Sequence, residues 1–237
     1  MRTRIALMIG ILIAVVTLAS SVILSQQTKS YDYKDFKAVS VGWGMHLTVT
    51  QSDHYSIEVK ADERDMKYLK VKKSGNKVRF EIDKLWGWRA KDDMYITITM
   101  PELRELDLSG GSEGMITMDI GQRDFEASLS GGATLDGKLQ CGNVTLDLSG
   151  GAKARFSGSG KILCVDGSGG AKAQLKQFTA RDVDVDLSGG ARVEITMNGR
   201  LDVDASGGSK VVYYGKARRG DINLSGGSNI DGKGTEE

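Results

Sequence analysis

Seven copies of the tripeptide Ser-Gly-Gly recur through the second half of the chain at an almost constant spacing. Intervals of 21, 19, 19, 20, 18 and 19 residues separate the copies, which begin at Ser109, Ser130, Ser149, Ser168, Ser188, Ser206 and Ser225. A period of about 20 residues is typical of a solenoid, in which each repeat buries its apolar face only by stacking on its neighbours. We therefore expect this half of the chain to wind into stacked coils.

Apolar and polar residues alternate on both sides of each Ser-Gly-Gly. The residues one and three before the serine are mostly apolar and the one between them is mostly aspartate, as in Leu146-Asp147-Leu148. A weaker alternation follows the glycines. A period of two indicates a β-strand with one buried face. Each repeat then predicts two short strands joined by a Ser-Gly-Gly corner and closed by a variable turn, such as Met197–Arg200 or Gly215–Gly220.

Backbone geometry and steric crowding explain why glycine recurs at the corners of such a fold. A tight corner needs a positive φ, and a Cβ there would meet the same corner one coil away. The small residue that follows each corner fits the same crowding, as in Ser112, Ala133, Ala152, Ala171, Ala191, Ser209 and Ser228. A flexible linker would not keep apolar residues in phase with the glycines, and a calcium-binding nonapeptide array would have a shorter period.

The rest of the chain divides into a leader, a first half and a tail. Residues 1–25 carry Arg2 and Arg4, then an uncharged apolar run, then small residues, which predicts a signal peptide or, alternatively, an uncleaved membrane anchor. Residues 31–100 are rich in strand signals and either continue the solenoid with degenerate coils or cap it. With the repeats at 101–232 they are expected to form one continuous domain, 31–232, before a charged tail at 233–237.

Several segments of the first half resemble one bacterial family. They are Phe36–Val41, Leu47–Gln51, Val78–Ile82, and Met100–Leu106 running into the first Ser-Gly-Gly. Together they are similar to the putative auto-transporter adhesin, head GIN domain family, which is common in Bacteroidetes. The resemblance implies an exported, all-β domain with a right-handed parallel β-helix, and it supplies no catalytic residues.

Charge and residue counts exclude several classes of site. The formal net charge is +1, which lacks the basic excess of a nucleic-acid binder. No histidine follows His54 to activate the corner serines, so these are read as structural. His46 and His54 are read as ordinary strand or surface residues. We assign no catalytic, cofactor-binding or metal-ligating residue from the sequence, and we expect no cofactor.

Three groups of side chains remain as candidates for binding. An acidic ladder could hold Ca²⁺ or be a solvated face balanced by a basic column; its members are Asp184, Asp186, Asp202, Asp204 and Asp221, and the column comprises Lys153, Lys172, Arg192 and Lys210. Trp43, Trp86 and Trp88 could stack on sugars or pack into a core or cap. Cys141 and Cys164 fall at different points of neighbouring coils and are expected to be free thiols.

The first functional hypothesis is a non-enzymatic, exported β-solenoid that binds a surface glycan or protein. Its location would be the periplasm, the outer membrane surface or the extracellular space, with membrane contact only through an uncleaved leader. A structural role in the cell envelope is the alternative. A polysaccharide-acting enzyme is the third, because parallel β-helices host lyases and hydrolases. The sequence leaves the oligomeric state open.

Overall fold

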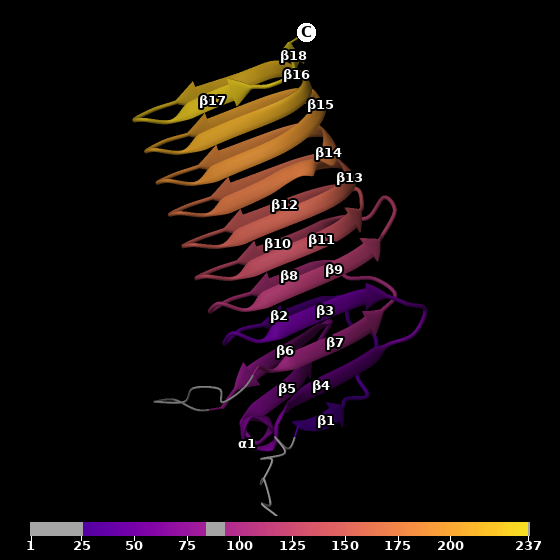
Figure 1. The fold of residues 1–237 in the computed structure, drawn as a ribbon. Helices are drawn as coiled ribbons and strands as arrows, with labels where there is room; N and C mark the ends of the chain where they lie inside the picture. Colours follow the sequence, from indigo (N-terminus) through magenta and orange to yellow (C-terminus); the bar gives the residue numbers. More distant parts are fainter. Residues whose placement is uncertain (1–25, 84–92, 237) are drawn as a thin grey trace, which may run out of the picture.

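The computed structural model describes residues 26–83 and 93–236, and these are almost entirely β-strand. All strands belong to one hydrogen-bonded, 18-stranded sheet that winds into a stack of coils (Figure 1). Within the described residues there is one short helix, α1 (Glu63–Met66). The predicted fold class, a β-solenoid, is confirmed.

The strand arm before each corner stacks in parallel, and so does the arm after it. Before the corner, β8 (Glu105–Leu108), β10 (Phe125–Leu129) and β12 (Asn143–Leu148) are neighbours. After the corner, β9 (Glu113–Asp119) lies beside β11 (Thr134–Gln140). The stack continues through β13 (Lys153–Gly167), β14 (Lys172–Leu187), β15 (Arg192–Ala205) and β16 (Lys210–Leu224), and it ends on β17 (Asn229–Gly232) and β18 (Thr235–Glu236).

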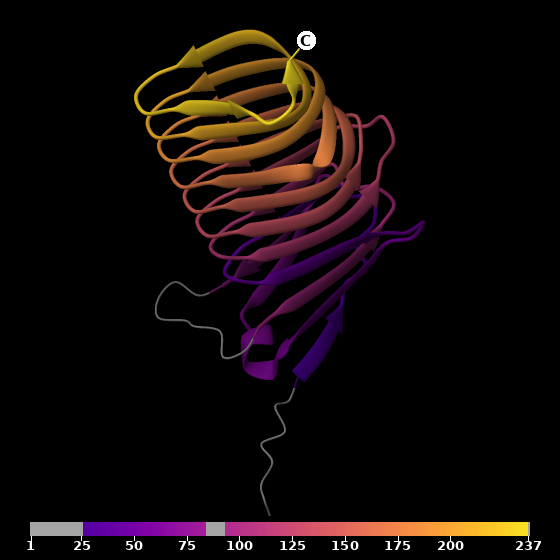
Figure 2. The same ribbon diagram turned by 45° about the horizontal axis from the view of Figure 1, so that its top comes forward.

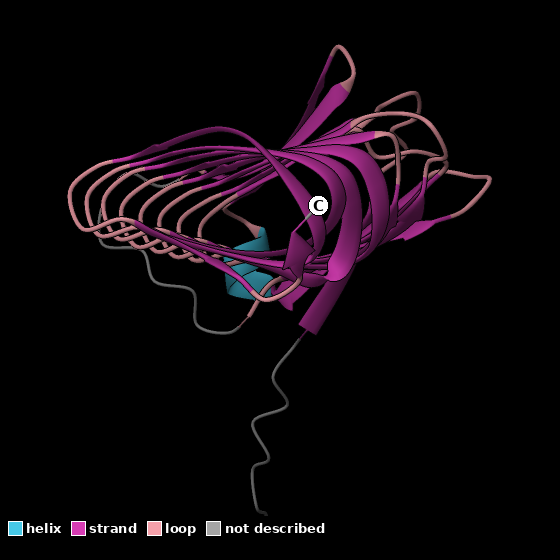
Figure 3. Cartoon of the chain, turned by 90° about the horizontal axis from the view of Figure 1, so that it is seen from above, coloured by secondary structure: helices cyan, strands magenta, loops and turns pink. Residues whose placement is uncertain are grey.

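The Ser-Gly-Gly corners line up along one edge of the stack (Figures 2 and 3). The Gly151 N–H donates to the Gly131 carbonyl at 2.7 Å, and the Gly170 N–H donates to the Gly150 carbonyl at the same distance. Gly150 has a φ of 68°, and a Cβ on it would lie 3.0 Å from the Gly131 oxygen. The positive φ and the close contact with the next coil, which the sequence predicts as the two reasons for glycine, are therefore both present at this corner.

The variable turn predicted at the other end of each coil is wrong for the last coils. Residues 197–200 lie inside β15 and residues 215–220 lie inside β16, so each strand bends without a break. Met197 and Ala217 stay buried at these bends, whereas Lys176 and Gln177 at the bend of β14 are both exposed. Register shifts fall near the bend, for example between Leu175 and Thr179. The differences in repeat length are thus absorbed by β-bulges in curved strands.

The N-terminal part both continues and caps the solenoid. The strands β2 (Ala38–Val41) and β3 (His46–Gln51) form a coil beside β8 and β9. The next coil outward is formed by β6 (Lys77–Ile82) and β7 (Tyr95–Met100), which come later in the sequence than β2 and β3. Antiparallel strands cover that end: β4 (Ser56–Asp62) on β7, β1 (Gln26–Ser30) on β4, and β5 (Leu69–Ser74) on β6.

The core is a continuous column of inward side chains from Phe36 to Ala217. The small residues after the corners, such as Ala133 and Ala152, are fully buried within it. At the far end Arg219, which is in register with Leu201 but exposed, donates to the Tyr213 hydroxyl at 3.3 Å. Among the described residues, no helix is long and apolar enough to cross a membrane.

Candidate functional site

Columns of opposite charge flank the row of corners, as the sequence predicted. Two residues before the serine, aspartates from successive coils lie in register: Asp147, Asp166, Asp186 and Asp204. Four residues past the serine, cations do the same: Lys153, Lys172, Arg192 and Lys210. The corner lies between these two columns.

The aspartate column lines a shallow groove of about 470 Å³ with the corner serines. Burial raises the pKa of Asp166, and the neighbouring Asp147 raises it further. Burial also raises the pKa of Asp184, with Asp202 the next cause. In the part of the chain that the structure describes, no group of three or more His, Cys, Asp or Glu side chains is placed to hold a metal ion. The register of the aspartates and the raised pKa of Asp166 show that the column is a row of mutually repelling carboxylates.

The sheet arm after the corner carries a different outward face. At its N-terminal end His46 lies between Tyr95 on β7 and Glu113 on β9. The His46 and Tyr95 rings stack with centroids 5.1 Å apart. His46 Nδ1 is 3.3 Å from Glu113 Oε2, and its Nε2 is 3.6 Å from Asp93 Oδ1. The imidazole thus lies between two carboxylates and stacks on the exposed tyrosine ring.

Beyond His46, β9 adds an exposed methionine, and β11 and β13 add an ion pair. Arg155 donates to Asp136 through both Nε and Nη2, at 2.5 and 2.6 Å. Hydrogen bonding to Asp136 raises the pKa of Arg155. Met115 is 58% exposed although it is apolar. A hollow of about 460 Å³ lies between the His46–Tyr95 pair and Arg155, and a second of about 480 Å³ continues beyond Arg155 toward Lys176.

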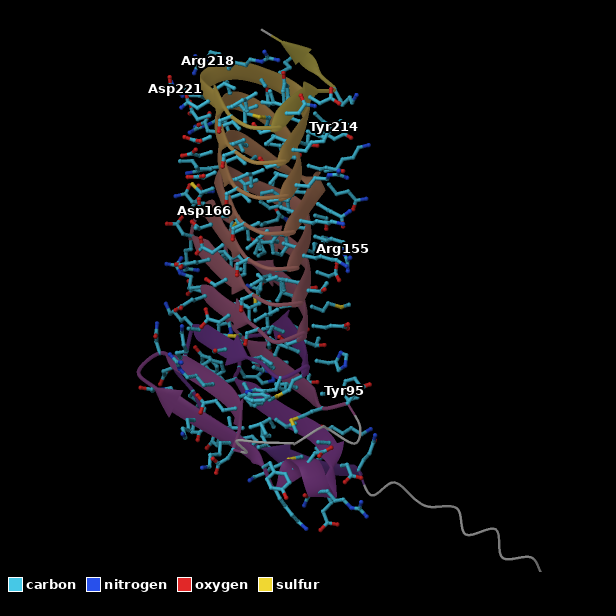
Figure 4. The ribbon with its side chains drawn as sticks, turned by 90° about the vertical axis from the view of Figure 1, so that its left-hand side faces the viewer. Tyr95, Arg155, Asp166, Tyr214, Arg218 and Asp221 are labelled. Carbon is cyan, nitrogen blue, oxygen red and sulfur yellow. The ribbon has the colours of Figure 1, made fainter. Side chains whose placement is uncertain are left out.

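The face ends at Tyr214 on β16, where Lys176 Nζ lies 4.4 Å from the tyrosine ring centroid. Tyr95, Arg155 and Tyr214 project from the same side of the stack, away from Asp166 (Figure 4). We call this surface the Tyr95–Tyr214 face, and its residues are His46, Tyr95, Glu113, Met115, Asp136, Arg155, Gln174, Lys176, Glu194 and Tyr214. It presents aromatic rings at both ends and hydrogen-bonding charges between them.

The other candidates from the sequence lie elsewhere. Trp43 is 55% exposed and forms part of a corner, so it does not pack into the core. Trp86 and Trp88 lie outside the described residues, as does the leader at 1–25. Cys141 and Cys164 are free thiols. Burial, followed by the charge of Asp124, raises the pKa of the Cys141 thiol to about 12, which leaves it unreactive at neutral pH.

Sequence reasoning missed Tyr95, Met115 and Arg155, three of the residues that make up this face. Their outward direction could have been read from the alternation in residues 95–100 and 113–119. Their proximity could not, because β3 lies between β7 and β9 in space but precedes both in sequence. His46 was treated as an ordinary strand residue, and it supports this cluster.

A family model described as "Putative auto-transporter adhesin, head GIN domain" matches residues 35–217. No curated protein matches the chain. A putative adhesin from Bacteroides fragilis NCTC 9343 has a solved structure with a TM-score of 0.75 and 19% identity, covering 90% of this chain and 97% of its own. A putative adhesin from Parabacteroides distasonis ATCC 8503 has a TM-score of 0.61 and 17% identity, covering 90% and 96%.

A third similar structure carries a different description. It is a putative lipid binding protein from Parabacteroides distasonis ATCC 8503, with a TM-score of 0.67 and 16% identity, covering 87% of this chain and 96% of its own. At such low identity these similarities show a shared fold, and a fold by itself does not define a ligand.

Proposed function

The chain belongs to the "Putative auto-transporter adhesin, head GIN domain" family, and from that premise we propose that it is an exported, non-enzymatic module that binds surface saccharides. The family match agrees with the resemblance drawn from the sequence. The single observation that carries the proposal is the exposed Tyr95 ring, stacked on His46 beside a hollow lined with charged hydrogen-bonding groups. Export is proposed from the apolar leader together with the adhesin-like family.

Saccharides suit the Tyr95–Tyr214 face for chemical reasons. A sugar ring offers an apolar C–H face that packs on an aromatic ring, and tyrosine supplies such a surface with a polar edge. The hydroxyl groups of the sugar can donate hydrogen bonds to the Glu113 and Asp136 carboxylates and accept them from Arg155 and Lys153. Two adjoining hollows on one face fit a chain of several sugar units better than a single small molecule.

The same geometry argues against glycoside hydrolysis on this face. A hydrolase needs one carboxylic acid that is free to protonate the leaving oxygen. Asp136 is held by both arms of the Arg155 guanidinium, and Glu113 is 3.3 Å from His46 Nδ1. A carboxylate that is held by a guanidinium, as Asp136 is, favours binding of hydroxyl groups over proton transfer.

The test is binding of residues 26–237 to a glycan array, with Tyr95→Ala and Tyr95→Phe measured in parallel. We expect the wild type to bind a defined set of glycans, Tyr95→Phe to keep it, and Tyr95→Ala to lose about tenfold or more in affinity at an unchanged melting temperature. Equal binding by Tyr95→Ala, or no glycan bound by the wild type, would overturn the proposal. Binding to phospholipid vesicles alone would favour lipid binding as the function instead.

A structural role in the envelope is the second candidate, and one feature favours it. Leu224 in the last coil is 42% exposed, so the apolar interior is incompletely covered at that end. An exposed parallel edge invites pairing with another chain. Concentration-dependent association in sedimentation, without glycan binding, would favour this role.

A further inference from the structure

A basic hollow lies at the bend of the last coils, away from both the acidic groove and the Tyr95–Tyr214 face. It measures about 400 Å³ and is lined by Arg181, Asp182, Asn198, Gly199, Lys216 and Arg218. Arg218 and Tyr214 project from opposite sides of the stack (Figure 4). The hollow exists because β14, β15 and β16 bend here as continuous strands, where the sequence suggested separate turns.

The strand register brings the polar groups of the hollow together. Asn198 pairs with Lys216, and Arg200 pairs with Arg218, on adjacent strands. Gly199 forms the floor, since a Cβ on it would lie 2.6 Å from the Arg181 carbonyl oxygen and 2.6 Å from Asp182 Oδ1. A side chain at this position would therefore collide with the Arg181 backbone and the Asp182 carboxylate.

The one carboxylate in the hollow is already engaged. Asp182 accepts the Arg200 backbone N–H at 3.0 Å and the Arg181 Nε–H at 2.7 Å. The hydrogen bond from Arg200 is the largest cause that lowers the pKa of Asp182, and the charge of Arg218 also contributes. Asp182 thus stays ionised and positions Arg181, while three cationic side chains surround it.

Arg200 pairs with Arg218 across the strands, but it does not line the hollow and is engaged by other carboxylates. It donates to Asp202 at 2.6 and 2.7 Å and to Asp221 at 3.0 Å. Arg218, which lies directly opposite it on the next strand, lines the hollow, and its charge helps to lower the pKa of Asp182. Like charges opposite each other destabilise a sheet unless a counter-charge is present. Because the residues that line the hollow include three cations and one carboxylate, the hollow favours an external anion.

We propose that this hollow binds an oxyanion, in the form of a phosphate ester. Guanidinium groups match the oxygens of phosphate in a planar, two-pronged geometry, which Arg181 and Arg218 can supply. Lys216 adds a point charge, and the Asn198 amide adds a neutral donor. This site is separate from the saccharide face, so either can be correct without the other.

The experiment is an NMR titration of residues 26–237 with glucose 6-phosphate, inorganic phosphate and glucose at constant ionic strength. We expect saturable amide shifts at Asn198, Gly199 and Arg218 with both phosphates and none with glucose. Arg218→Gln is expected to weaken binding about tenfold, the usual effect of losing a charge-assisted hydrogen bond. Arg192→Gln removes the same charge from the basic column and should leave the affinity unchanged.

A second variant helps to distinguish a loss of phosphate binding from misfolding. Asn198→Asp places a negative charge in the hollow and should abolish binding, with melting temperatures recorded for each variant. Shifts that do not saturate, or equal weakening by Arg192→Gln and Arg218→Gln, would overturn the proposal. Vesicles containing phosphatidylglycerol distinguish the source of the ester: binding to vesicles and to glucose 6-phosphate indicates the phosphate group itself, whereas binding to vesicles alone contradicts a site of this size.

Discussion

Trp43 occupies the corner position that Gly110 occupies in the next coil, with φ values of 63° and 61°. Val41 pairs with Leu108 and His46 with Glu113, so Gly42–Met45 corresponds to Ser109–Ser112. The first coil thus makes the same corner with a tryptophan in the left-handed region, which costs a non-glycine residue roughly 1–2 kcal/mol.

Replacing this tryptophan should stabilise the protein. Trp43→Gly removes the left-handed strain but adds freedom to the unfolded chain, so we expect the free energy of unfolding to rise by about 1 kcal/mol. Urea denaturation measures it. A decrease would mean that the tryptophan side chain makes stabilising contacts that outweigh its backbone strain.

The two glycines of one corner should differ sharply in their tolerance of alanine. Gly150→Ala meets both a φ of 68° and the Gly131 oxygen at 3.0 Å, so a loss of about 2 kcal/mol is expected. Gly151→Ala is the matched control, because its Cβ would lie 3.4 Å from the same oxygen. Equal melting temperatures for the two variants would contradict the stacking of the corners.

Neutralising the centre of the aspartate column should stabilise the fold at neutral pH. The pKa of Asp166 is raised in the folded state above its ordinary value of 3.8, so its charge opposes folding above that raised pKa. Asp166→Asn should gain under about 1 kcal/mol at pH 7. The gain should fade as the pH falls through the raised pKa toward 3.8.

Asp202→Asn is the matched control, for which we expect a loss of stability at pH 7 where Asp166→Asn gives a gain. The hydrogen bond from Arg200 lowers the pKa of Asp202, so its stabilising effect is present above its ordinary value of 3.8 and is lost as the pH falls through the lowered pKa. Chemical denaturation of both variants from pH 3 to 7 compares them. The same pH trend in both would be incompatible with this assignment.

Lys77 connects the capping coil to the repeats through ion pairs. Its Nζ donates to Glu105 and, at 2.9 Å, to Asp107, both on β8, although β2 lies between β6 and β8. Burial lowers the pKa of Lys77, but its two carboxylate partners outweigh this effect and raise it overall. The stabilisation is therefore complete below the ordinary value of 10.5 and is lost as the pH rises through the raised value.

Lys77→Met should lower the free energy of unfolding by about 1–3 kcal/mol at pH 7, because it leaves two partly buried carboxylates without their cation. Lys70→Met, which removes a more exposed pair with Asp83, should cost under about 1 kcal/mol. Urea denaturation at pH 7 compares the two variants. Equal losses would show that Lys77 acts as an ordinary surface ion pair.

The repeat made the C-terminal half predictable, while the order of the N-terminal strands was not. A fixed period, alternating side chains and corner glycines all followed from contacts between neighbouring repeats, such as Gly150 with Gly131. The capping coil depends on β6 and β7 passing beyond β2 and β3, and no periodicity encodes that return. The pairing of His46 with Tyr95 results from it, so the candidate site could not be assembled from the sequence.

The most direct test of saccharide binding on the Tyr95–Tyr214 face is an NMR map of the protein with a glycan selected from the array. We predict saturable shifts concentrated in residues 46–48, 95–97, 113–115 and 134–136, with the corner glycines unaffected. Shifts confined to the corners, the cap or the acidic groove would contradict it.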